Sequence, residues 1–541
     1  MEQFLSKHAN AVIGVLSGFD RLVFRGTLRM LAQRAGMMVY LRARQVLLKD
    51  FARHAEACTA QLRDASEQLA RRSNRPIQYV PSSATSKEEL ARKIAAADGI
   101  KQGLICVLTA VEPCLSYQIV RDRDAKRLRL EPRHRKCLHL YHYQIHPMFG
   151  FMHARIQTWF PFSIQICLNG REWLARNMAA AGLGHIQRDN CFTWLEHPEQ
   201  AQRLMDQQVQ AAWPELLNGI ARSLNPRHDT MFQAYPVEYY WSTYQSEWAT
   251  DILFRDTAAL ARLYPKLVHH GLTTFLSPDV MRFLGRPIPP TGNILPQFKA
   301  DVTSDVKRRA EGVRIKHWVG DNSIKMYDKA MPSGVDPREA AALRIETTIN
   351  DAAGFKSYRT PERKPEAPQK WRRMRKGIAD LHRRTEVSQA ANDRYLRALA
   401  SVDDTTSLGE LTAGLCRPAK YNGRRVRPLN PHAPADAALL EAISRGEFTL
   451  NGFRNRDLRQ LLFTAAPIAK PEQKRRAAAT SRKLALLRAH HLIRKLPHTH
   501  RYHLTDAGRI AVTALISARN ASTQCLSGNK LSPESRLAVV G

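Results

Sequence analysis

Residues 474–504, KRRAAATSRKLALLRAHHLIRKLPHTHRYHL, decide the fold predicted for the C-terminal part of the chain. Four small or apolar residues recur at the spacing of one helix face, namely Ala477, Thr480, Leu484 and Leu487. The cations of this stretch lie mostly off that face. Residues 492–496 and 501–504 then predict two short strands joined by a turn. We therefore expect a helix with one buried side and one cationic side, followed by a basic hairpin.

Two further helices are predicted before this stretch, at residues 439–443 and 455–463, and Asn455 is placed to cap the second one. After the hairpin, Thr505 is placed to cap a final helix that ends at Asn520. In this order the elements resemble the winged-helix DNA-binding domains of bacterial regulators. In those domains the hairpin is often followed by Leu-Thr-x-x-Gly-Arg, the pattern of residues 504–509.

The resemblance implies that the third helix enters the major groove of DNA and that the hairpin lies near phosphates. On the third helix the candidate contacts are Arg475, Arg476, Arg482 and Lys483, and on the hairpin they are Lys495, His500 and Arg501. An alternative is a winged helix that binds another protein and whose basic surface is incidental.

Composition favours a polyanionic partner. The chain has 541 residues with 83 Lys and Arg against 49 Asp and Glu, which gives a formal net charge of +34. Such a balance is typical of proteins that neutralise phosphate. No apolar run is long enough to span a membrane and the N-terminus lacks the pattern of a signal peptide, so we expect a cytoplasmic protein without a membrane partner. The eight cysteines form no Cys-x-x-Cys pair, which predicts free thiols.

The whole pattern predicts an α+β protein, with mixed and antiparallel sheet in the N-terminal and central region, a helical connector and a C-terminal winged helix. The predicted segments are 1–110 (α/β), 111–300 (antiparallel sheet plus helices), 301–360 (a small β unit), 370–417 (the connector), 436–520 (the winged helix) and 521–541 (a tail). The connector is expected to begin with a long helix over residues 370–400. Its first turns hold a run of cations that could grip a nucleic-acid backbone, among them Arg372, Arg373 and Arg375.

An aromatic cluster lies between residues 235 and 248. Tyr240, Tyr244 and Trp248 recur at helical spacing, which predicts the buried stripe of a helix. Stacking on single-stranded bases is the alternative role for such side chains.

A second informative region alternates polar and apolar residues with a period of two, over residues 313–319, 322–329 and 343–350. This pattern predicts three antiparallel strands. On them Lys325, Tyr327 and Lys329 share one face, as do Arg344, Glu346 and Thr348.

Residues 324–329 and 343–346 resemble the Tyr-Asp/Asn-Lys strand and the Arg-x-Glu strand of rolling-circle replication initiators of the trans-acting plasmid type. The resemblance implies that Tyr327 is a nucleophile that becomes linked to a nicked strand, with Lys329 beside it. It further implies that Glu346 is a base or a ligand of Mg²⁺ or Mn²⁺, because a phenol with a pKa of about 10 needs assistance at neutral pH. Asp20, expected at the tip of a hairpin over residues 11–26, is a second candidate ligand. The alternative is that Tyr327 and Glu346 form a hydrogen-bonded ladder in an ordinary sheet, in which Lys329 and Arg344 pair with the acids.

These patterns predict a DNA-binding protein of a mobile element, either a replication initiator or another strand-nicking enzyme. Two alternatives remain, a DNA-binding regulator without catalytic activity and an RNA-binding protein. The Walker loop, the dinucleotide glycine fingerprint, Gly-x-Ser-x-Gly and His-Glu-x-x-His are all missing from the sequence, which argues against ATPases, dehydrogenases, esterases of that type and zincins. The chain as a whole also resembles a group of long, basic bacterial proteins whose openings are similar to residues 18–26, and this resemblance implies no function.

Overall fold

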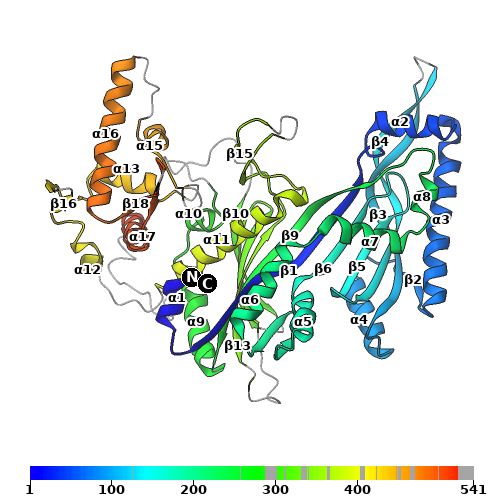
Figure 1. Cartoon of the computed structure of the whole chain (residues 1–541), viewed down its shortest axis with the longest axis horizontal. Helices are drawn as coiled ribbons and strands as arrows, with labels where there is room; N and C mark the ends of the chain where they lie inside the picture. Colours follow the sequence, from blue (N-terminus) through cyan, green and yellow to red (C-terminus); the bar gives the residue numbers. More distant parts are fainter. Residues whose placement is uncertain are drawn as a thin grey trace, which may run out of the picture. The chain divides into compact units, whose positions relative to one another are not determined.

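The computed structural model confirms the α+β class (Figure 1). It describes residues 1–122, 124, 126–255, 257–286, 301–309, 312–329, 338, 340–361, 366–401, 408–421, 423–445, 448, 452–463, 469–497 and 499–521. The chain divides into two compact units. Unit 1 comprises residues 1–269 and 304–396, and unit 2 comprises residues 270–303 and 397–541.

Unit 1 is built on an eleven-stranded sheet with the order β10-β11-β12-β13-β9-β1-β6-β5-β4-β3-β2. Its strands are β1 (Val12–Leu28), β2 (Ile77–Tyr79), β3 (Gly103–Asp122), β4 (Arg127–His146), β5 (Gly150–Gln157), β6 (Ile164–Asn169), β9 (Tyr239–Phe254), β10 (Val302–Arg309), β11 (Gly312–Val319), β12 (Asn322–Asp328) and β13 (Ala341–Ile349). Neighbours from β11 to β3 pair antiparallel, and β2 joins β3 in parallel. The predicted segments 1–110, 111–300 and 301–360 therefore contribute to one sheet.

Helices cover much of this sheet. On one face, α5 (Gly170–Ala180), α6 (Pro198–Gln207) and α7 (Trp213–Leu224) bury apolar side chains against β1, β6 and β5. A further helix, α11 (Leu381–Leu399), packs on β9 and β13, where Asn392 donates to the carbonyl oxygens of Trp248 and Ile345. Towards the β2 end of the sheet, α2 (Arg34–Ala43) and α3 (Phe51–Arg72) contribute to a second core with β4, and α4 (Lys87–Ala97) to a third with β3.

The other elements of unit 1 are short, apart from a helix that continues into unit 2. They are α1 (Glu2–Lys7), η1 (Leu48–Asp50), β7 (His185–Arg188), β8 (Cys191–Leu195), η2 (Gln208–Gln210), α8 (His228–Met231), α9 (Thr257–Thr273), β14 (Lys356–Arg359), β15 (Lys370–Arg373) and η3 (Ile378–Asp380).

The expected hairpin over residues 11–26 is wrong, because β1 is one continuous strand of 17 residues. Gly18 is not a turn residue. A Cβ atom there would lie 2.2 Å from Cε of Met205 on α6, so the glycine allows the helix to approach the strand closely. Asp20 consequently lies in the middle of a strand rather than at an exposed tip.

Two helical predictions are also wrong. Tyr240, Tyr244 and Trp248 lie on strand β9, where they alternate with residues that face the other side of the sheet. The predicted helix over residues 370–400 begins as strand β15, which pairs with β14, and becomes helical only from Ile378. In both segments the pairing with a neighbouring strand overrides the local helical pattern.

Unit 2 contains α10 (Ser277–Phe283), α12 (Leu408–Ala413), β16 (Ala419–Tyr421), β17 (Arg424–Val426), α13 (Pro434–Ile443), α15 (Asn455–Leu462), α16 (Lys470–Ala489), β18 (Ile493–Lys495), β19 (Tyr502–Leu504) and α17 (Asp506–Asn520). In the described residues from α13 to α17, the order of three helices, a hairpin and a helix is the expected one. These elements share one core, which includes Leu440, Leu458, Leu487, Ile493 and Val512. The assignment to the winged-helix class stays a prediction.

The helix ends test the predicted caps. Thr505 caps α17, since its Oγ1 accepts a hydrogen bond from the Gly508 N–H at 2.9 Å. Asn455 is not the cap of α15 but its first residue, and Asp457 instead accepts from the Arg454 N–H at 2.7 Å. Most of the predicted tail, residues 522–541, lies outside the described residues. Within the described ranges, no helix has the length and apolar character needed to cross a membrane.

Candidate functional site

Strands β12, β13, β9 and β1 are neighbours in the sheet of unit 1, and they bring polar side chains from distant parts of the sequence together. In the register of the sheet, Lys325 lies opposite Glu346 and Tyr327 lies opposite Arg344. Arg344 in turn lies opposite Asp251 on β9. Successive side chains of a strand alternate between the two faces, so these residues share the face that is turned away from α11.

A β-bulge adds Asp20 to this group. Phe19 lies opposite Trp248 and Arg21 lies opposite Glu247, so β1 has one extra residue, Asp20, between two consecutive residues of β9. A bulge changes the direction in which a strand presents its side chains, and bulges are common beside active sites. Here it places a carboxylate next to those of β9 and β13.

The result is a cluster of three carboxylates, Asp20, Glu247 and Glu346, in which one oxygen atom of each lies within 4.8 Å of one oxygen atom of the other two. Asp20 and Glu346 are buried, with 5% and 1% of their surface exposed, while Glu247 is half-buried. Carboxylate oxygens are the preferred protein ligands of hard divalent cations such as Mg²⁺ and Mn²⁺. The donor set therefore fits such a cation.

Tyr327 and Lys325 both contact this cluster through Glu346. The Tyr327 hydroxyl donates to Oε2 of Glu346 at 2.6 Å, and the Lys325 ammonium donates to Oε1 at 2.5 Å. Burial raises the pKa of Glu346, but Lys325 and the two hydrogen bonds outweigh it and hold the pKa at about 2. Burial and the negative charge of Glu346 raise the pKa of Tyr327 well above its usual value.

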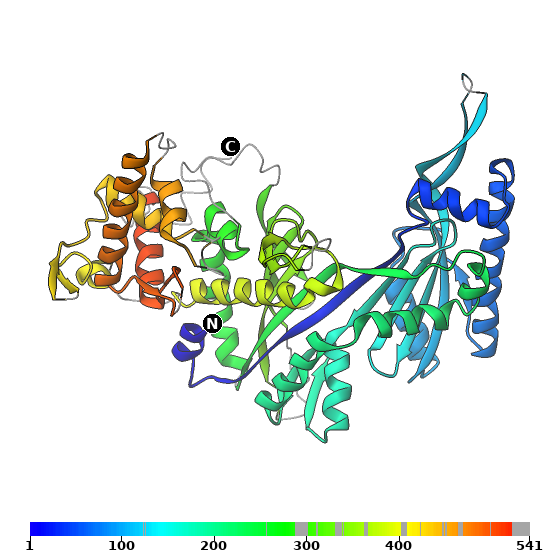
Figure 2. The same cartoon turned by 45° about the horizontal axis from the view of Figure 1, so that its top comes forward.

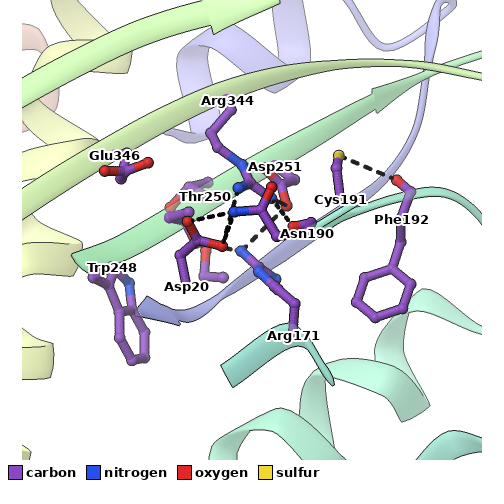
Figure 3. A network of polar contacts seen from close by, with 12 residues as sticks. Asp20, Arg171, Asn190, Cys191, Phe192, Trp248, Thr250, Asp251, Arg344 and Glu346 are labelled. Atoms are coloured by element: carbon purple, nitrogen blue, oxygen red, sulfur yellow. Dashed lines mark hydrogen bonds and ion pairs between the residues drawn. The ribbon is translucent and has the colours of Figure 1, made fainter. Parts of the chain in front are cut away.

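Arg344 is the structural centre of the group (Figure 3). It donates through Nε and Nη2 to both oxygens of Asp251, at 2.5 and 2.7 Å, and through Nη1 to Asp20 at 3.2 Å. Asn190 also donates to Asp20, and Arg171 pairs with Asp251 at 3.2 Å. Arg344 and Arg171 have no exposed surface. The two arginines therefore fix the position of both aspartates.

The cluster carries more negative than positive charge. Among the described residues, the cations that form ion pairs with Asp20, Glu247, Asp251 and Glu346 are Lys325, Arg344 and Arg171. Within ion-pair distance there is thus one cation fewer than there are carboxylates, while Arg21 and Lys329 act from further away and lower the pKa values of Glu247 and Asp251. Burial and the nearby Glu346 raise the pKa of Glu247 to about 7, and burial raises the pKa of Asp20. A divalent cation would supply the missing positive charge.

A cavity of about 560 Å³ opens beside the cluster. Asp20, Asn190 and Lys329 line one part of it, and Phe151, with the Arg92 guanidinium 4.0 Å from its ring centre, lines another. Charged and aromatic side chains together suit a ligand with both polar groups and a flat apolar surface. Of the three carboxylates, Asp20 lines the cavity, so a ligand there would approach the cluster from the side of Asp20.

The structure brings Tyr327, Glu346 and Asp20 together, as the sequence predicted, although Asp20 comes from a bulge and not from a hairpin tip. Lys329 lines the cavity, but the lysine that contacts Glu346 is Lys325. Sequence reasoning missed Glu247 as a member of the cluster. Glu247 is two residues from both Gln245 and Ala249, a spacing that places the three on one face of a strand. The helical interpretation of β9 concealed this pattern.

The cations of the predicted connector do not form one helical face. Arg372 and Arg373 lie on β15, half-buried and exposed respectively. Arg375 follows the strand and donates to Asp380, through Nε at 3.2 Å and through its backbone N–H at 2.7 Å. The side chain of Arg375 therefore helps to hold η3 in place.

In unit 2 the predicted contact residues lie on α16 and the hairpin β18–β19. Arg475 and Arg476 both pair with Glu472 at 2.7 Å, one turn earlier on the same helix. Arg482, Lys495 and His500 are exposed, and Lys483 and Arg501 are half-buried. Ala477 is partly buried, and Thr480, Leu484 and Leu487 are buried, so the helix has the apolar face expected from the sequence.

Comparisons with known proteins found no relative of this chain. No protein-family model, no curated protein and no solved structure matches the chain.

Proposed function

We propose that the protein is a metal-dependent DNA strand-nicking and strand-transfer enzyme of a mobile element, with Tyr327 as the nucleophile. The observation that carries the proposal is the contact between the Tyr327 hydroxyl and the carboxylate cluster of Asp20, Glu247 and Glu346. A tyrosine beside three clustered carboxylates combines a nucleophile, a base and the ligands of a divalent cation.

In the proposed reaction the phenolic oxygen of Tyr327 attacks the phosphorus of a phosphodiester. The phenolic proton passes by way of Glu346, which accepts a hydrogen bond from the hydroxyl at 2.6 Å, to water. The bond from phosphorus to one sugar oxygen breaks, and that oxygen takes a proton from water. The products are a phosphotyrosine link and a free hydroxyl end, and attack by such a hydroxyl reverses the step.

The charge of the cluster determines when Tyr327 can react. The negative charge of Glu346 is one cause of the raised pKa of Tyr327. Neutralisation of the carboxylates therefore brings the phenol closer to ionisation. A bound divalent cation supplies that neutralisation and also stabilises charge on the scissile phosphate. Arg344 keeps Asp20 in place as a ligand, and Lys325 orients Glu346. Without a divalent cation the enzyme should be inactive.

Unit 2 would hold the target duplex. Its exposed cations on α16 and on the hairpin β18–β19 are suited to a helix in the major groove with a hairpin near phosphates. The net charge of +34 supports a nucleic-acid partner for the chain as a whole.

The decisive experiment incubates the protein with labelled supercoiled DNA and labelled single-stranded DNA, with Mg²⁺, Mn²⁺ or EDTA. We expect relaxed product and a covalent adduct that survives denaturation, both only with a metal. Tyr327→Phe should lose both products and keep DNA binding. Tyr358→Phe is the matched control, because Tyr358 is 54% exposed and its ring contacts Trp371.

Two outcomes would overturn the proposal. If wild type and Tyr327→Phe bind DNA equally and neither cleaves it under any condition, the protein is a regulator without catalytic activity. If nucleic acid that co-purifies with the protein is degraded by RNase and not by DNase, an RNA-binding function replaces the proposed DNA-nicking function.

A further inference from the structure

A long two-stranded ribbon extends from the sheet of unit 1 (Figure 2). Strand β4 pairs with β5 only from His139 onward, and β3 pairs with β2 only at residues 107–109. Within the described strands, residues 111–122 and 127–138 are consequently paired with each other and with no third strand. At the base of this pair, the Thr158 N–H donates to the carbonyl oxygen of Leu138 and Ser116 donates to that of Phe160. We call this part the β3–β4 ribbon. At about 3.4 Å per residue it is about 40 Å long.

The ribbon is held in a defined shape. Its pairing runs without a register shift from Val111, opposite Leu138, to Asp122, opposite Arg127. Tyr117 and Leu130 are buried in the core that includes α2. A ladder anchored in this way loses little conformational entropy when it binds a partner.

The surface of the ribbon is strongly basic. It carries six cations against three carboxylates, and five of the cations are exposed, namely Arg121, Arg127, Arg133, Arg135 and Lys136. One of the carboxylates, Glu112, forms ion pairs with two residues outside the ribbon, Lys87 at 3.1 Å and Arg155 at 3.6 Å. Four consecutive exposed residues, Arg133–Lys136, present cationic or titratable groups to both sides of the ribbon.

We infer that the β3–β4 ribbon is a second duplex-DNA-binding element, which lies in the major groove and is separate from the cations of unit 2. The major groove of B-form DNA is about 12 Å wide and admits a two-stranded β-ribbon, whose strands are about 4.8 Å apart. Exposed cations on both sides of the ribbon would then meet the phosphates of both strands. The major groove of A-form RNA is too narrow and deep to be read in this way, which favours DNA.

The ribbon also offers apolar contacts. Val111 and Leu115 are 48% and 49% exposed, and Leu128 is 37% exposed. Side chains of this kind contact thymine methyl groups in the major groove. The alternative is that the charges only keep an exposed strand edge soluble and prevent it from pairing with another chain. That alternative predicts no effect on DNA binding.

The inference rests on the proposed function only in taking DNA as the ligand, and its test is independent of cleavage. In the full chain, the triple variant Arg127→Ala, Arg133→Ala and Lys136→Ala is compared with Arg53→Ala, Arg63→Ala and Arg71→Ala. The control removes three exposed cations from α3 of the same unit and changes the net charge equally. Both variants are checked for an unchanged thermal melt.

The probe is a 40-base-pair duplex of random sequence, titrated at several salt concentrations. We expect the ribbon variant to bind at least about tenfold more weakly, with a log–log salt slope lower by roughly 2 to 3, since each lost phosphate contact removes about 0.9. The affinity of the α3 control variant for the duplex should differ from that of wild type by less than about twofold. Equal behaviour of the two variants would overturn the inference, whatever the outcome for Tyr327.

A second measurement locates the contact directly. A photo-crosslinking amino acid at Leu128, on the ribbon, should form adducts with the duplex, while one at Leu47, which is 61% exposed before α3, should not. Equal crosslinking from both positions would contradict a specific role for the ribbon. Preferential crosslinking to an RNA duplex would show that the ligand of the ribbon is RNA and not DNA.

Discussion

The hydroxyl of Tyr327 donates to Oε2 of Glu346 across 2.6 Å, although the two residues are not directly opposite each other in the sheet. Tyr327 faces Arg344, and Glu346 faces Lys325, so the contact is diagonal. Lys325 holds one oxygen of Glu346, which leaves the other directed at the phenol. The predictions below follow from this arrangement and from the charges around it.

We expect Glu346→Gln to abolish stabilisation by a divalent cation. The substitution keeps the shape of the side chain but removes one of three carboxylates that fit the cation. Wild type should gain about 2.7 kcal/mol at a Mn²⁺ concentration one hundred times its Kd, and the variant should gain none. Thermal melts with Mn²⁺ and with EDTA measure the difference. Glu238→Gln, at a side chain that is 68% exposed, is the control, and an equal gain in the Glu346 variant would exclude it as a ligand.

The effect of Mn²⁺ should grow with pH. Burial and the charge of Glu346 raise the pKa of Glu247 to about 7 from the ordinary value of 4.5. Binding of the cation requires the deprotonated form, so the rise in Tm caused by Mn²⁺ should be larger at pH 8 than at pH 6. A rise that does not depend on pH would show that Glu247 takes no part in binding.

The raised pKa of Glu247 also predicts how the stability of the metal-free protein depends on pH. A carboxyl group whose pKa rises on folding contributes stability below its unfolded pKa, and that contribution is lost as the pH rises through the folded value. In EDTA, Glu247→Gln should therefore be more stable than wild type at pH 8, by about 1 to 3 kcal/mol. The difference should shrink towards pH 5. Urea unfolding at both pH values tests the sign, and a variant less stable than wild type at pH 8 would contradict it.

Arg344→Met should be among the most destabilising substitutions in unit 1. It leaves Asp20 without its ion-pair partner and Asp251 with Arg171 alone, and all of these groups are buried. Removal of one partner of a buried ion pair costs about 3–5 kcal/mol, which urea unfolding can measure. The exposed Arg63→Met should change stability by less than about 0.5 kcal/mol. A similarly small change in both variants would mean that water replaces the guanidinium.

Substitution of Arg482, Lys483 and Lys495 by alanine should weaken binding of duplex DNA and lower the salt slope by roughly 2 to 3. Cleavage of a single-stranded substrate should persist, because these residues belong to unit 2 and the nucleophile to unit 1. The triple variant Arg417→Ala, Lys420→Ala and Arg425→Ala removes three exposed cations that precede α13, changes the net charge equally and serves as the control. Equal weakening by both sets would point to a non-specific effect of net charge. Fluorescence anisotropy is the measurement.

The sequence predicted the pairing of Tyr327 with Glu346 because alternation with a period of two places side chains on a face without knowledge of the rest of the fold. It misplaced Asp20 because a glycine in a strand can indicate either a turn or a close approach. Only the position of Met205 decides between these roles at Gly18. It missed Glu247 because the aromatic residues of β9 also fit a helical period. That ambiguity is resolved by β1 and β13, which pair with β9 from distant parts of the chain.

The ion pair between Asp20 and Arg344 joins residues that are 324 positions apart. A ribosome that adds about 5 to 20 residues per second needs roughly 15 to 65 s to make the intervening chain. Until β13 has left the ribosome, Asp20 and Asp251 lack this counter-charge, and neither Tyr327 nor Glu346 has taken its place. Under the proposed mechanism, a nascent or truncated chain would therefore be unable to cut DNA before its synthesis has passed β13.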